Sequence, residues 1–398
     1  MSTVATLGPR ARPRAERSSL LDAVRFCAMV FLTLRVLTLL AGLAAGAFPA
    51  LRAQGVPGWA APPVHPGFGD TFSVFERFDA LWFLRIAETG YRSGDGSAAF
   101  LPLFPLAIGA VSAVIGGHTY AASLLVSNGA FVVALVVLYR LSEFEFGTRT
   151  ARATIVLLCC FPTAYFFLFP YSESLFLLCA VTAFHSARHR RWWVAGLAAA
   201  LAASTRSIGF ILVPAIAIEA IHQREEGRGS AVPGLTAAAA GALGTLAYLA
   251  WWQLRDGDWL IPLVRQQNWE RGFSWPWQTL WDAGRIAMQQ FGKPSGGYWV
   301  FDLAIVIPVI ALAVVVAVRM RPSYAIYVWG SLLAPLAFVF AGRPLMSMPR
   351  FVVTLFPVTW ALARATEARP LVRGAVVLGG AVALSIACVL TVNWFYLF

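Results

Sequence analysis

Residues 301–318 read FDLAIVIPVIALAVVVAV, an apolar run that contains a single acidic side chain. Polar and apolar side chains do not alternate in this run, as they do in a strand of a membrane β-barrel. Coiled as a helix, it has close to the length needed to cross the ~30 Å hydrocarbon core of a bilayer. Comparable runs recur along the chain, so the sequence predicts an all-α polytopic membrane protein.

The composition indicates the same class of protein. The chain of 398 residues is 59% hydrophobic and only 13% charged, whereas a soluble domain carries about 25% charged residues. These proportions exclude a soluble globular enzyme, a disordered chain and a nucleic-acid-binding module. The net charge of +12 reflects 31 basic against 19 acidic residues. Because cytoplasmic loops of membrane proteins collect Lys and Arg, this excess indicates membrane topology, and no nucleic-acid partner is expected.

Residues 1–23 form a basic segment that we expect in the cytoplasm. The apolar run that follows, to about residue 50, is longer than the roughly 7–15 residues of a signal-peptide core and contains Arg35. We therefore predict an uncleaved first helix and a single transmembrane domain over 24–398.

The segments that interrupt the apolar runs are of two kinds, which alternate along the chain. Five are short and basic: 140–152, 188–191, 224–228, 319–321 and 364–373. The others carry aromatics, prolines and carboxylates: 51–119, 170–174, 204–207, 253–298 and 342–350. Placing the basic segments in the cytoplasm places the other kind outside the cell. Loops 51–119 and 253–298 are then extracytoplasmic, the first with surface helices and the second rich in Trp.

This alternation requires that the apolar stretch 101–116 does not cross the membrane, since a crossing would turn every later basic loop outward. We therefore expect an interfacial or re-entrant helix there, in keeping with its two prolines and two glycines. About eleven spans (10–12) remain: 24–48, 120–139, 152–169, 174–187, 192–204, 208–222, 232–252, 299–318, 323–341, 351–363 and 374–394.

The first outer loop contains RFDALWFLRIAETGY at 77–91, which has the spacing of an amphipathic helix. In such a helix Asp79 and Trp82 lie on one face. A carboxylate beside aromatic rings can act as a general base. The alternative is that Asp79 only pairs with Arg77 or Arg85.

Other charged side chains lie between or within the predicted spans. Glu173 is one, and an ionised group at this depth is usually functional or paired; the alternative is a place in the first turn of a helix that Ser172 caps. Arg35, Arg206 and Arg350 are cations at or within the membrane boundary. Guanidinium groups suit bidentate phosphate binding, and snorkelling to the interface is the alternative for Arg350.

Asp256-Gly257-Asp258 has the form of a metal–nucleotide DxD motif, but its central Gly favours a turn. The five histidines are dispersed, and there is no Walker loop, dinucleotide fingerprint or GxSxG motif, so neither a metal nor a cofactor is expected. Loop 253–298 holds five Trp within 23 residues. Trp commonly lies at the membrane interface, and part of this loop could also cover a sugar acceptor.

Six segments occur in one order along the chain: Arg77-Phe78-Asp79-Ala80, Ile86-Ala87-x-x-Gly90-Tyr91, 99–106, 170–174, Thr205-Arg206-Ser207-x-Gly209, and Ser347-x-Pro349-Arg350-Phe351 with Phe356-Pro357. Together they resemble the bacterial relatives of the PIG-V mannosyltransferases, which add a mannose during GPI-anchor synthesis in eukaryotes. The family usually has Trp, Phe and Tyr where this chain has Phe78, Leu101 and Phe351. The last difference removes a hydroxyl group.

The resemblance implies a GT-C glycosyltransferase fold, a helix bundle whose active site faces outward and whose first outer loop carries an essential acidic residue. It implies a polyprenyl-phosphate mannose donor. No metal is required if guanidinium groups stabilise the leaving phosphate. Asp79 is then the candidate catalytic residue, Arg206 and Arg350 are candidate phosphate contacts, and Glu173 orients the acceptor or supports the structure. The candidate substrate-binding residues are Arg77, Trp82, Glu173, Arg206, Arg350 and Arg35.

We therefore expect inverting transfer of mannose from the lipid phosphate to a hydroxyl of a glycolipid, glycan or protein, with Asp79 as the base. The near absence of lysine beside abundant Ala and Arg indicates a bacterial genome. We therefore expect the protein in a bacterial inner membrane, with its active site on the outer side. One alternative is a lipid-linked sugar flippase or transporter without transferase activity. A second, an acyl- or phosphotransferase, would need a histidine- or nucleophile-centred motif that the sequence lacks.

Overall fold

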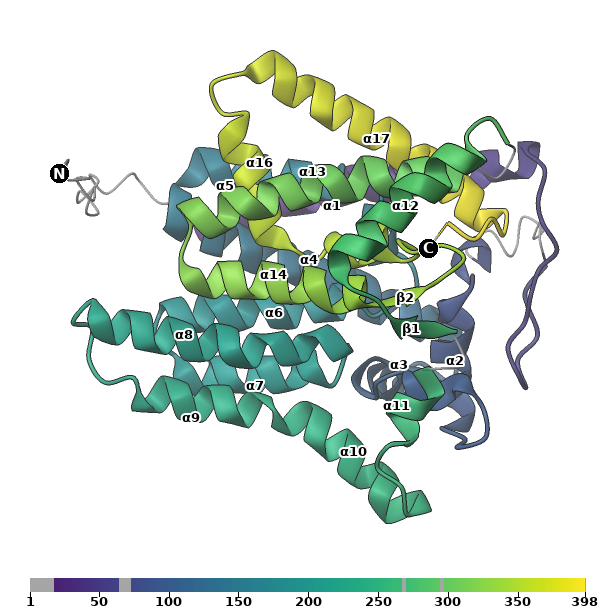
Figure 1. Cartoon of the computed structure of the whole chain (residues 1–398), viewed down its shortest axis with the longest axis horizontal. Helices are drawn as coiled ribbons and strands as arrows, with labels where there is room; N and C mark the ends of the chain where they lie inside the picture. Colours follow the sequence, from purple (N-terminus) through teal and green to yellow (C-terminus); the bar gives the residue numbers. More distant parts are fainter. Residues whose placement is uncertain (1–17, 64–72, 267–269, 294–296, 398) are drawn as a thin grey trace.

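The computed structural model describes residues 18–63, 73–266, 270–293 and 297–397, which form a bundle of helices with one small sheet (Figure 1). The helices are α1 (Leu20–Ala44), α2 (Asp79–Thr89), α3 (Leu103–Val114), α4 (Thr119–Phe146), α5 (Thr148–Cys159), α6 (Glu173–Arg188), α7 (Trp192–Ala203), α8 (Leu212–Glu225), α9 (Val232–Gly241), α10 (Leu243–Asp256), α11 (Ile261–Arg265), α12 (Pro276–Gln290), α13 (Gly297–Arg319), α14 (Pro322–Ala337), α15 (Met348–Val352), α16 (Phe356–Ala365) and α17 (Pro370–Val392). The antiparallel strands are β1 (Arg271–Phe273) and β2 (Phe338–Phe340). Most of the predicted amino-terminal segment, residues 1–17, lies outside the described residues.

The predicted class, a polytopic helical membrane protein, is confirmed. Among the described residues, five helical segments are long and apolar enough to cross a membrane: Leu20–Ala47, Thr119–Phe146, Val232–Asp256, Gly297–Arg319 and Pro370–Val392. The other six predicted spans overlap the shorter helices α5, α6, α7, α8, α14 and α16. The total of about eleven spans stays a prediction.

Several of the predicted spans extend beyond the end of their helix. The span predicted over 152–169 leaves the α-helical conformation after Cys159, and only a short 3₁₀ helix, Ala164–Phe167, follows within it. The span predicted over 323–341 leaves the helical conformation after Ala337, because the chain continues as β2 and pairs with β1. The span predicted over 374–394 ends as a helix at Val392. Trp394 follows with a positive φ of 65°, a conformation that stops a helix of L-residues.

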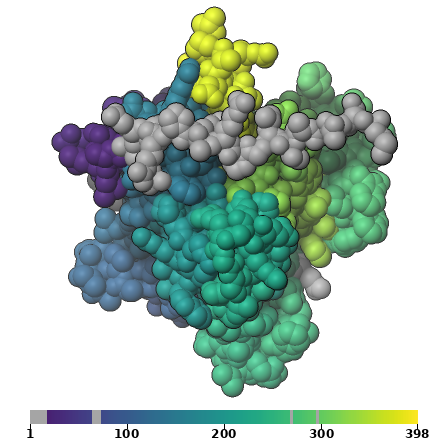
Figure 2. All heavy atoms as spheres, turned by 90° about the vertical axis from the view of Figure 1, so that its left-hand side faces the viewer, coloured from purple at the N-terminus to yellow at the C-terminus, as the bar shows by residue number. Residues whose placement is uncertain are grey.

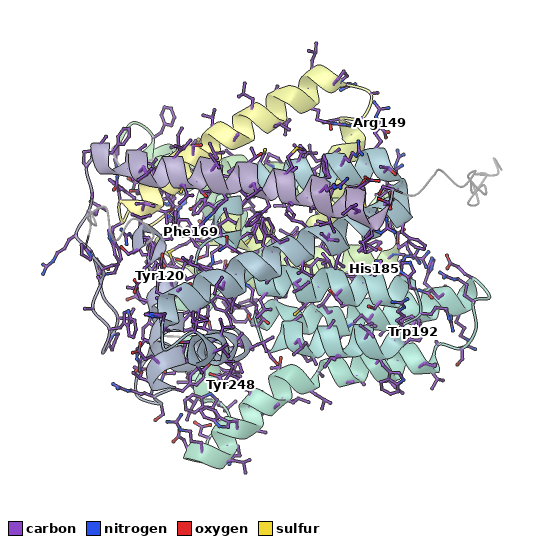
Figure 3. All side chains as sticks on the ribbon, turned by 180° about the vertical axis from the view of Figure 1, so that it is seen from behind. Tyr120, Arg149, Phe169, His185, Trp192 and Tyr248 are labelled. Atoms are coloured by element: carbon purple, nitrogen blue, oxygen red, sulfur yellow. The ribbon has the colours of Figure 1, made fainter. Side chains whose placement is uncertain are left out.

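The two kinds of interrupting segment separate to opposite ends of the bundle. Figure 1 shows the turns α4–α5, α8–α9, α13–α14 and α16–α17 at the left, and α2, α11, β1 and β2 at the right. Figure 3, which views the molecule from behind, places Arg149, His185 and Trp192 toward one end, and Tyr120 and Tyr248 toward the other. We call these the basic end and the Asp79 end.

Helix α3 covers most of the stretch 101–116 and does not run with the bundle. It is seen nearly end-on in Figure 1, whereas the neighbouring long helices run across the picture. It has 12 residues, and its direction across the bundle distinguishes it from α5 and α7, which are equally short. The prediction that this stretch does not count as a span is therefore consistent with its geometry.

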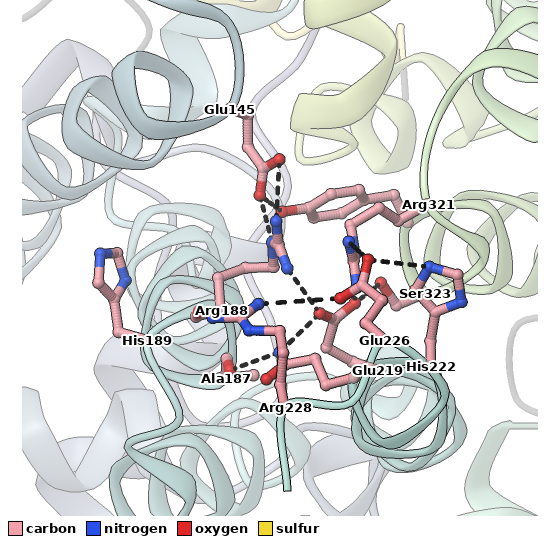
Figure 4. Close-up of polar contacts among 12 residues, drawn as sticks. Glu145, Ala187, Arg188, His189, Glu219, His222, Glu226, Arg228, Arg321 and Ser323 are labelled. Atoms are coloured by element: carbon pink, nitrogen blue, oxygen red, sulfur yellow. Dashed lines mark hydrogen bonds and ion pairs between the residues drawn. The ribbon is translucent and has the colours of Figure 1, made fainter. Parts of the chain in front are cut away.

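Ion pairs tie four helices together at the basic end (Figure 4). Arg188 of α6 bonds to Glu145 of α4 and, at 3.0 Å, to Glu219 of α8. Glu219 also accepts from Arg321, just before α14, at 3.1 Å, and Arg321 reaches Glu226 at 2.8 Å. Because Glu219 has no exposed surface, it needs these cations as partners. Part of the basic character of the loops thus belongs to a structural network.

Small residues let the inner helices approach closely. A Cβ added to Gly196 of α7 would lie 2.6 Å from the carbonyl oxygen of Ala237 in α9. A Cβ on Gly244 of α10 would lie 1.9 Å from the carbonyl oxygen of Ala200 in α7. Such contacts exclude any larger residue, as at helix interfaces inside membranes generally. Around them, α6 is packed against α4, α7 and α8, and most of its side chains are buried.

Candidate active site

An ion-paired group of four side chains lies at the Asp79 end. Asp79 is the first residue of α2, and its Oδ2 accepts a hydrogen bond from Nη1 of Arg350, which belongs to α15. The Nε of Arg350 donates to Oε1 of Glu173, the first residue of α6. The same Oε1 accepts from Nη1 of Arg206, which follows α7. Two carboxylates and two guanidinium groups from four separate segments thus form one chain of charges, which we call the Asp79 cluster.

The Asp79 cluster is shielded from solvent, except at one member. The Glu173 side chain is completely buried, Arg350 is 8% exposed and Arg206 is 10% exposed, whereas Asp79 is 23% exposed. Isolated charges at such depth are very costly, and mutual pairing reduces the cost. Asp79 is therefore the carboxylate of the cluster that a substrate can reach.

The alternatives that the sequence left open for the carboxylates fare differently: the one for Asp79 is wrong, whereas Glu173 does lie in the first turn of α6 with Ser172 at the N-cap position. Asp79 pairs with Arg350 and with neither basic neighbour on its own segment: Arg85 pairs with Asp95 at 2.7 Å, and the Nε of Arg77 donates to the carbonyl oxygen of Val392 at 2.8 Å. At the start of α6 the Ser172 side chain makes no capping bond.

Arg271, which the sequence analysis did not select, is a further cation close to the cluster. It is the first residue of β1, and its pairing with Phe340 of β2 holds it beside α15. Its guanidinium lies 3.5 Å from the Ser347 hydroxyl and 5.8 Å from the centre of the Phe351 ring. Arg206 faces the same ring at 5.1 Å. Among the described residues, Arg271 has no carboxylate within ion-pairing distance.

Burial lowers the pKa of Arg271, while the charges of Tyr396 and Asp79 act in the opposite direction. A guanidinium stays protonated in proteins, so this partly buried cation carries a full charge near Asp79. A cation held near the exposed carboxylate of the cluster, without a carboxylate of its own, is suited to bind an anionic group.

Residues 393–397 also reach the site. The ring of Phe78 packs edge-on against Trp394 at 5.3 Å and Tyr396 at 5.0 Å. Arg343 holds this segment by donating to the carbonyl oxygens of Tyr396 at 2.8 Å and Leu397 at 2.6 Å. Burial, together with the charge of Asp79, raises the pKa of Tyr396 to about 12. Its neutral hydroxyl therefore persists beside Asp79 across the physiological range.

Unusual backbone conformations concentrate here. The described chain has five non-glycine residues with positive φ: Phe78, Arg190, Glu270, Ser347 and Trp394. Phe78 directly precedes Asp79, Glu270 precedes Arg271, Ser347 lies three residues before Arg350, and Trp394 packs on Phe78. Such conformations cost of order 1–3 kcal/mol each and persist mainly where function requires a particular placement. Their gathering supports a functional site.

The remaining predicted site residues have other contacts. Arg77 is fully buried, and its guanidinium lies 4.9 Å from the Trp394 ring. Trp82 stacks on Phe100 with ring centres 5.6 Å apart. Arg35 lies 5.0 Å from the Phe75 ring and forms no ion pair with a carboxylate of the described residues. Arg77 thus supports the backbone behind Asp79.

Metal ligands and the Trp-rich loop complete the description. No group of three or more His, Cys, Asp or Glu side chains in the described residues is arranged to hold a metal ion.

In the Trp-rich loop, Trp275 and Trp277 stack 4.8 Å apart, and both are more than half exposed. Trp281 on α12 is 71% exposed, and Trp269 lies outside the described residues. This exposure fits a membrane interface.

Comparisons with known proteins identify the relatives of this chain. The family model described as Mannosyltransferase (PIG-V) matches residues 23–224. The GPI alpha-1,6-mannosyltransferase 2 of Mus musculus is 33% identical over 145 residues, which are 34% of this chain and 29% of the mouse protein. That of Rattus norvegicus is 36% identical over 147 residues, 34% of this chain and 30% of the rat protein. The matches thus span less than a third of the length of these relatives.

Among solved structures, ArnT from Cupriavidus metallidurans in the apo state superposes with a TM-score of 0.50. The superposition covers 94% of this chain and 77% of ArnT, at 13% sequence identity. This likeness shows the fold, which is that of the GT-C membrane glycosyltransferases. The family model covers half of the chain and includes Asp79, Glu173 and Arg206. The chain belongs to the PIG-V mannosyltransferase family.

Proposed function

We propose that this protein is an inverting mannosyltransferase that moves mannose from a polyprenyl-phosphate donor to a hydroxyl of a glycolipid, glycan or protein. The observation that carries the proposal is the Asp79 cluster, in which the one carboxylate with appreciable exposure is held by Arg350. Family membership and the GT-C fold support the reaction class.

In the proposed reaction, Asp79 accepts the proton of the acceptor hydroxyl as the hydroxyl oxygen attacks the anomeric carbon. The bond from that carbon to the phosphate oxygen breaks, and the lipid phosphate leaves with the electron pair. Arg350 positions Asp79, and Glu173 fixes Arg350 from behind. The arginines stabilise the negative charge that develops on the leaving phosphate.

Arg271 is the best phosphate ligand of the group. Arg206 and Arg350 already donate to carboxylates, so a phosphate would have to compete for their donors. The Arg271 guanidinium is bonded only weakly, to the Ser347 hydroxyl at 3.5 Å. The positive charges of Arg206 and Arg350 then stabilise the donor phosphate at a distance, and Arg271 donates hydrogen bonds to it directly.

The charge distribution supports the proposed orientation in the membrane. The arginine-rich turns lie at the basic end, opposite Asp79 (Figure 1). Since Lys and Arg mark the cytoplasmic side, we place the Asp79 end outside, at the outer face of a bacterial inner membrane. A lipid-linked donor is consistent with this side, where nucleotide sugars are absent.

The test is sugar transfer by purified protein in liposomes that contain radiolabelled polyprenyl-phosphate mannose and a membrane lipid extract. Wild type and the control Asp282→Asn, on the surface of α12, should move label to a new product. Asp79→Asn should lower the rate about 10²- to 10⁴-fold. Transfer by Asp79→Asn at the wild-type rate would exclude Asp79 as the base. Donor that crosses the bilayer unchanged, without product, would establish a transporter instead.

A further inference from the structure

Helix α17 is joined to the bundle mainly through its final turns. Its buried residues lie between Leu384 and Val392, whereas Leu371 is 89% exposed and Leu378 is 68% exposed. A Cβ on Gly380 would lie 2.2 Å from the carbonyl oxygen of Cys160, at the end of α5. Toward its amino terminus α17 diverges from this contact, and its start stands out from the bundle (Figures 1 and 2).

The divergence leaves a cleft of about 570 Å³ between α1, α5 and α17 at the basic end. Ligand sites in proteins have volumes of roughly 300–1,000 Å³, so the cleft is large enough for part of a lipid. Its apolar walls are formed by Phe26, Ala153, Val156, Leu157 and Val377.

Three arginines stand at the wide end of this cleft. Arg149 and Arg152 belong to the first turns of α5, and Arg373 belongs to the first turn of α17. The apolar lining residues Leu157 and Val377 lie farther along the same helices, toward the middle of the bundle. The cleft is therefore cationic where it opens at the basic end and apolar deeper along the bundle.

The charges of these arginines are only weakly compensated. Arg149 approaches Glu367 at 4.0 Å, and both side chains are exposed, which makes a weak ion pair. Arg373 donates to the carbonyl oxygen of Ala363 at 3.0 Å. Among the described residues, neither Arg152 nor Arg373 has a carboxylate within ion-pairing distance. On α1, the positive charge of Arg152 acts on the Asp22 carboxylate without an ion pair. Asp22 accepts a hydrogen bond from the Ser19 hydroxyl, three residues earlier.

We infer that this cleft binds an anionic glycerophospholipid of the membrane leaflet at the basic end. The lipid phosphate bonds to Arg149, Arg152 and Arg373, since guanidinium groups bind phosphate bidentately. One acyl chain lies against Phe26, Leu157 and Val377. A free phosphate would leave the apolar wall unused, and a lipid without net negative charge would leave the positive charge uncompensated. The inference is independent of the proposed sugar transfer, because the cleft lies at the opposite end of the bundle.

The experiment uses purified, delipidated protein titrated with phosphatidylglycerol or phosphatidylcholine of identical chains, and measures bound lipid by native mass spectrometry. The first variant is the triple substitution Arg149→Gln/Arg152→Gln/Arg373→Gln. Its control, Arg191→Gln/Arg224→Gln/Arg319→Gln, removes the same charge from exposed arginines of the same end. A third protein, Val377→Trp, fills the apolar wall and keeps every arginine.

Wild type should retain phosphatidylglycerol and show weaker retention of phosphatidylcholine. The first triple variant should bind phosphatidylglycerol at least about tenfold more weakly, as expected for the loss of charge-assisted hydrogen bonds. Val377→Trp should also weaken binding, and the control triple variant should not. Equal retention of the two lipids, or an equal loss in the control triple variant, would overturn the inference. A Val377→Trp protein with wild-type retention would show that the apolar wall takes no part.

Discussion

Asp79 and Arg350 are 271 positions apart in the sequence and form an ion pair. The same guanidinium is bonded to Glu173, so the position of Asp79 is determined jointly by α2, α15 and α6. The carboxylate with appreciable exposure is thus fixed by a residue that is itself almost fully buried. In the proposed reaction, the orientation of Asp79 as the base is therefore set before a substrate binds, which favours proton transfer.

Replacing Glu173 by Gln should destabilise the protein. Arg206 and Arg350 share Oε1 of this buried carboxylate, and its loss leaves two buried guanidinium groups with one carboxylate. Removing one partner of a buried ion pair costs about 3–5 kcal/mol. Denaturant unfolding in detergent should show this loss in the free energy of unfolding. The control Glu225→Gln, 68% exposed, should change little. A Glu173→Gln protein as stable as this control would contradict the pairing.

Replacing Arg271 by Gln should impair donor binding more than the chemical step. Its guanidinium has no carboxylate partner in the described chain, so its loss removes the proposed phosphate contact without leaving a buried carboxylate unpaired. We expect the KM for the lipid donor to rise about tenfold, and Arg271→Lys to restore part of the affinity. Arg285→Gln on α12 is the control. Steady-state kinetics would argue against this role if kcat alone fell and KM stayed constant.

Trp394→Ala should reduce both stability and transfer. The indole ring is 3% exposed and packs against Phe78 and the Arg77 guanidinium. Truncation of a buried Trp costs about 3–5 kcal/mol, and here it also frees the residue before Asp79. The comparison is Trp277→Ala, at a ring that is 64% exposed, followed by thermal unfolding and transfer assays. Equal effects of the two substitutions would show that residues 393–397 do not support the site.

Two glycine substitutions should act in opposite directions. Gly244→Ala places a methyl group 1.9 Å from the Ala200 carbonyl oxygen and forces α10 away from α7, which should lower the melting temperature. Gly284→Ala, in α12, adds a methyl group with no atom within 4 Å. Because Ala is favoured over Gly in a helix by about 1 kcal/mol, this variant should melt at the same or a higher temperature. A lower melting temperature for Gly284→Ala alone would reverse the expectation.

The Arg85–Asp95 pair predicts a loss of stability in acid. Burial raises the pKa of Asp95, but hydrogen bonds from Ser97 and the positive charge of Arg85 outweigh burial, so the folded pKa lies below the unfolded value. A lowered folded pKa stabilises the protein above the unfolded pKa of about 3.9, and this stabilisation is lost as the pH falls through the folded pKa. The difference in unfolding free energy between wild type and Asp95→Asn should therefore shrink below about pH 4. A constant difference down to pH 2 would refute the assignment.

Hydrophobic runs and charge alternation predict most of the fold because both are local properties of the sequence. Each predicted span overlaps a helix, and 101–116 contains the crosswise helix α3. The boundaries fail where tertiary contacts decide them. Ala337 precedes a strand because β1, more than 60 residues earlier, supplies its partner, and the positive φ of Trp394 accompanies a ring contact with Phe78.

The sequence predicts only part of the candidate site, because tertiary contacts bring the other residues to it. Asp79, Glu173, Arg206 and Arg350 are visible in the sequence as charges in unusual apolar settings, and the structure joins them in one cluster. Arg271 and Tyr396 were missed because nothing local distinguishes them from an interfacial arginine and a terminal tyrosine. For Tyr396, the available signal in the sequence was its place in a run of three aromatic residues, 394–396.

The contacts of residues 393–397 also determine when the enzyme is completed during synthesis. Asp79 and Glu173 leave the ribosome early, whereas Arg350 and the segment that packs on Phe78 come after most of the helices. Until α15 and α17 are inserted, the buried carboxylate has only Arg206 as a partner, and the residue before Asp79 lacks its ring contacts. A chain that ends before α15 lacks the partner of Asp79, so the proposed transferase activity is expected to appear only after α15 is in place.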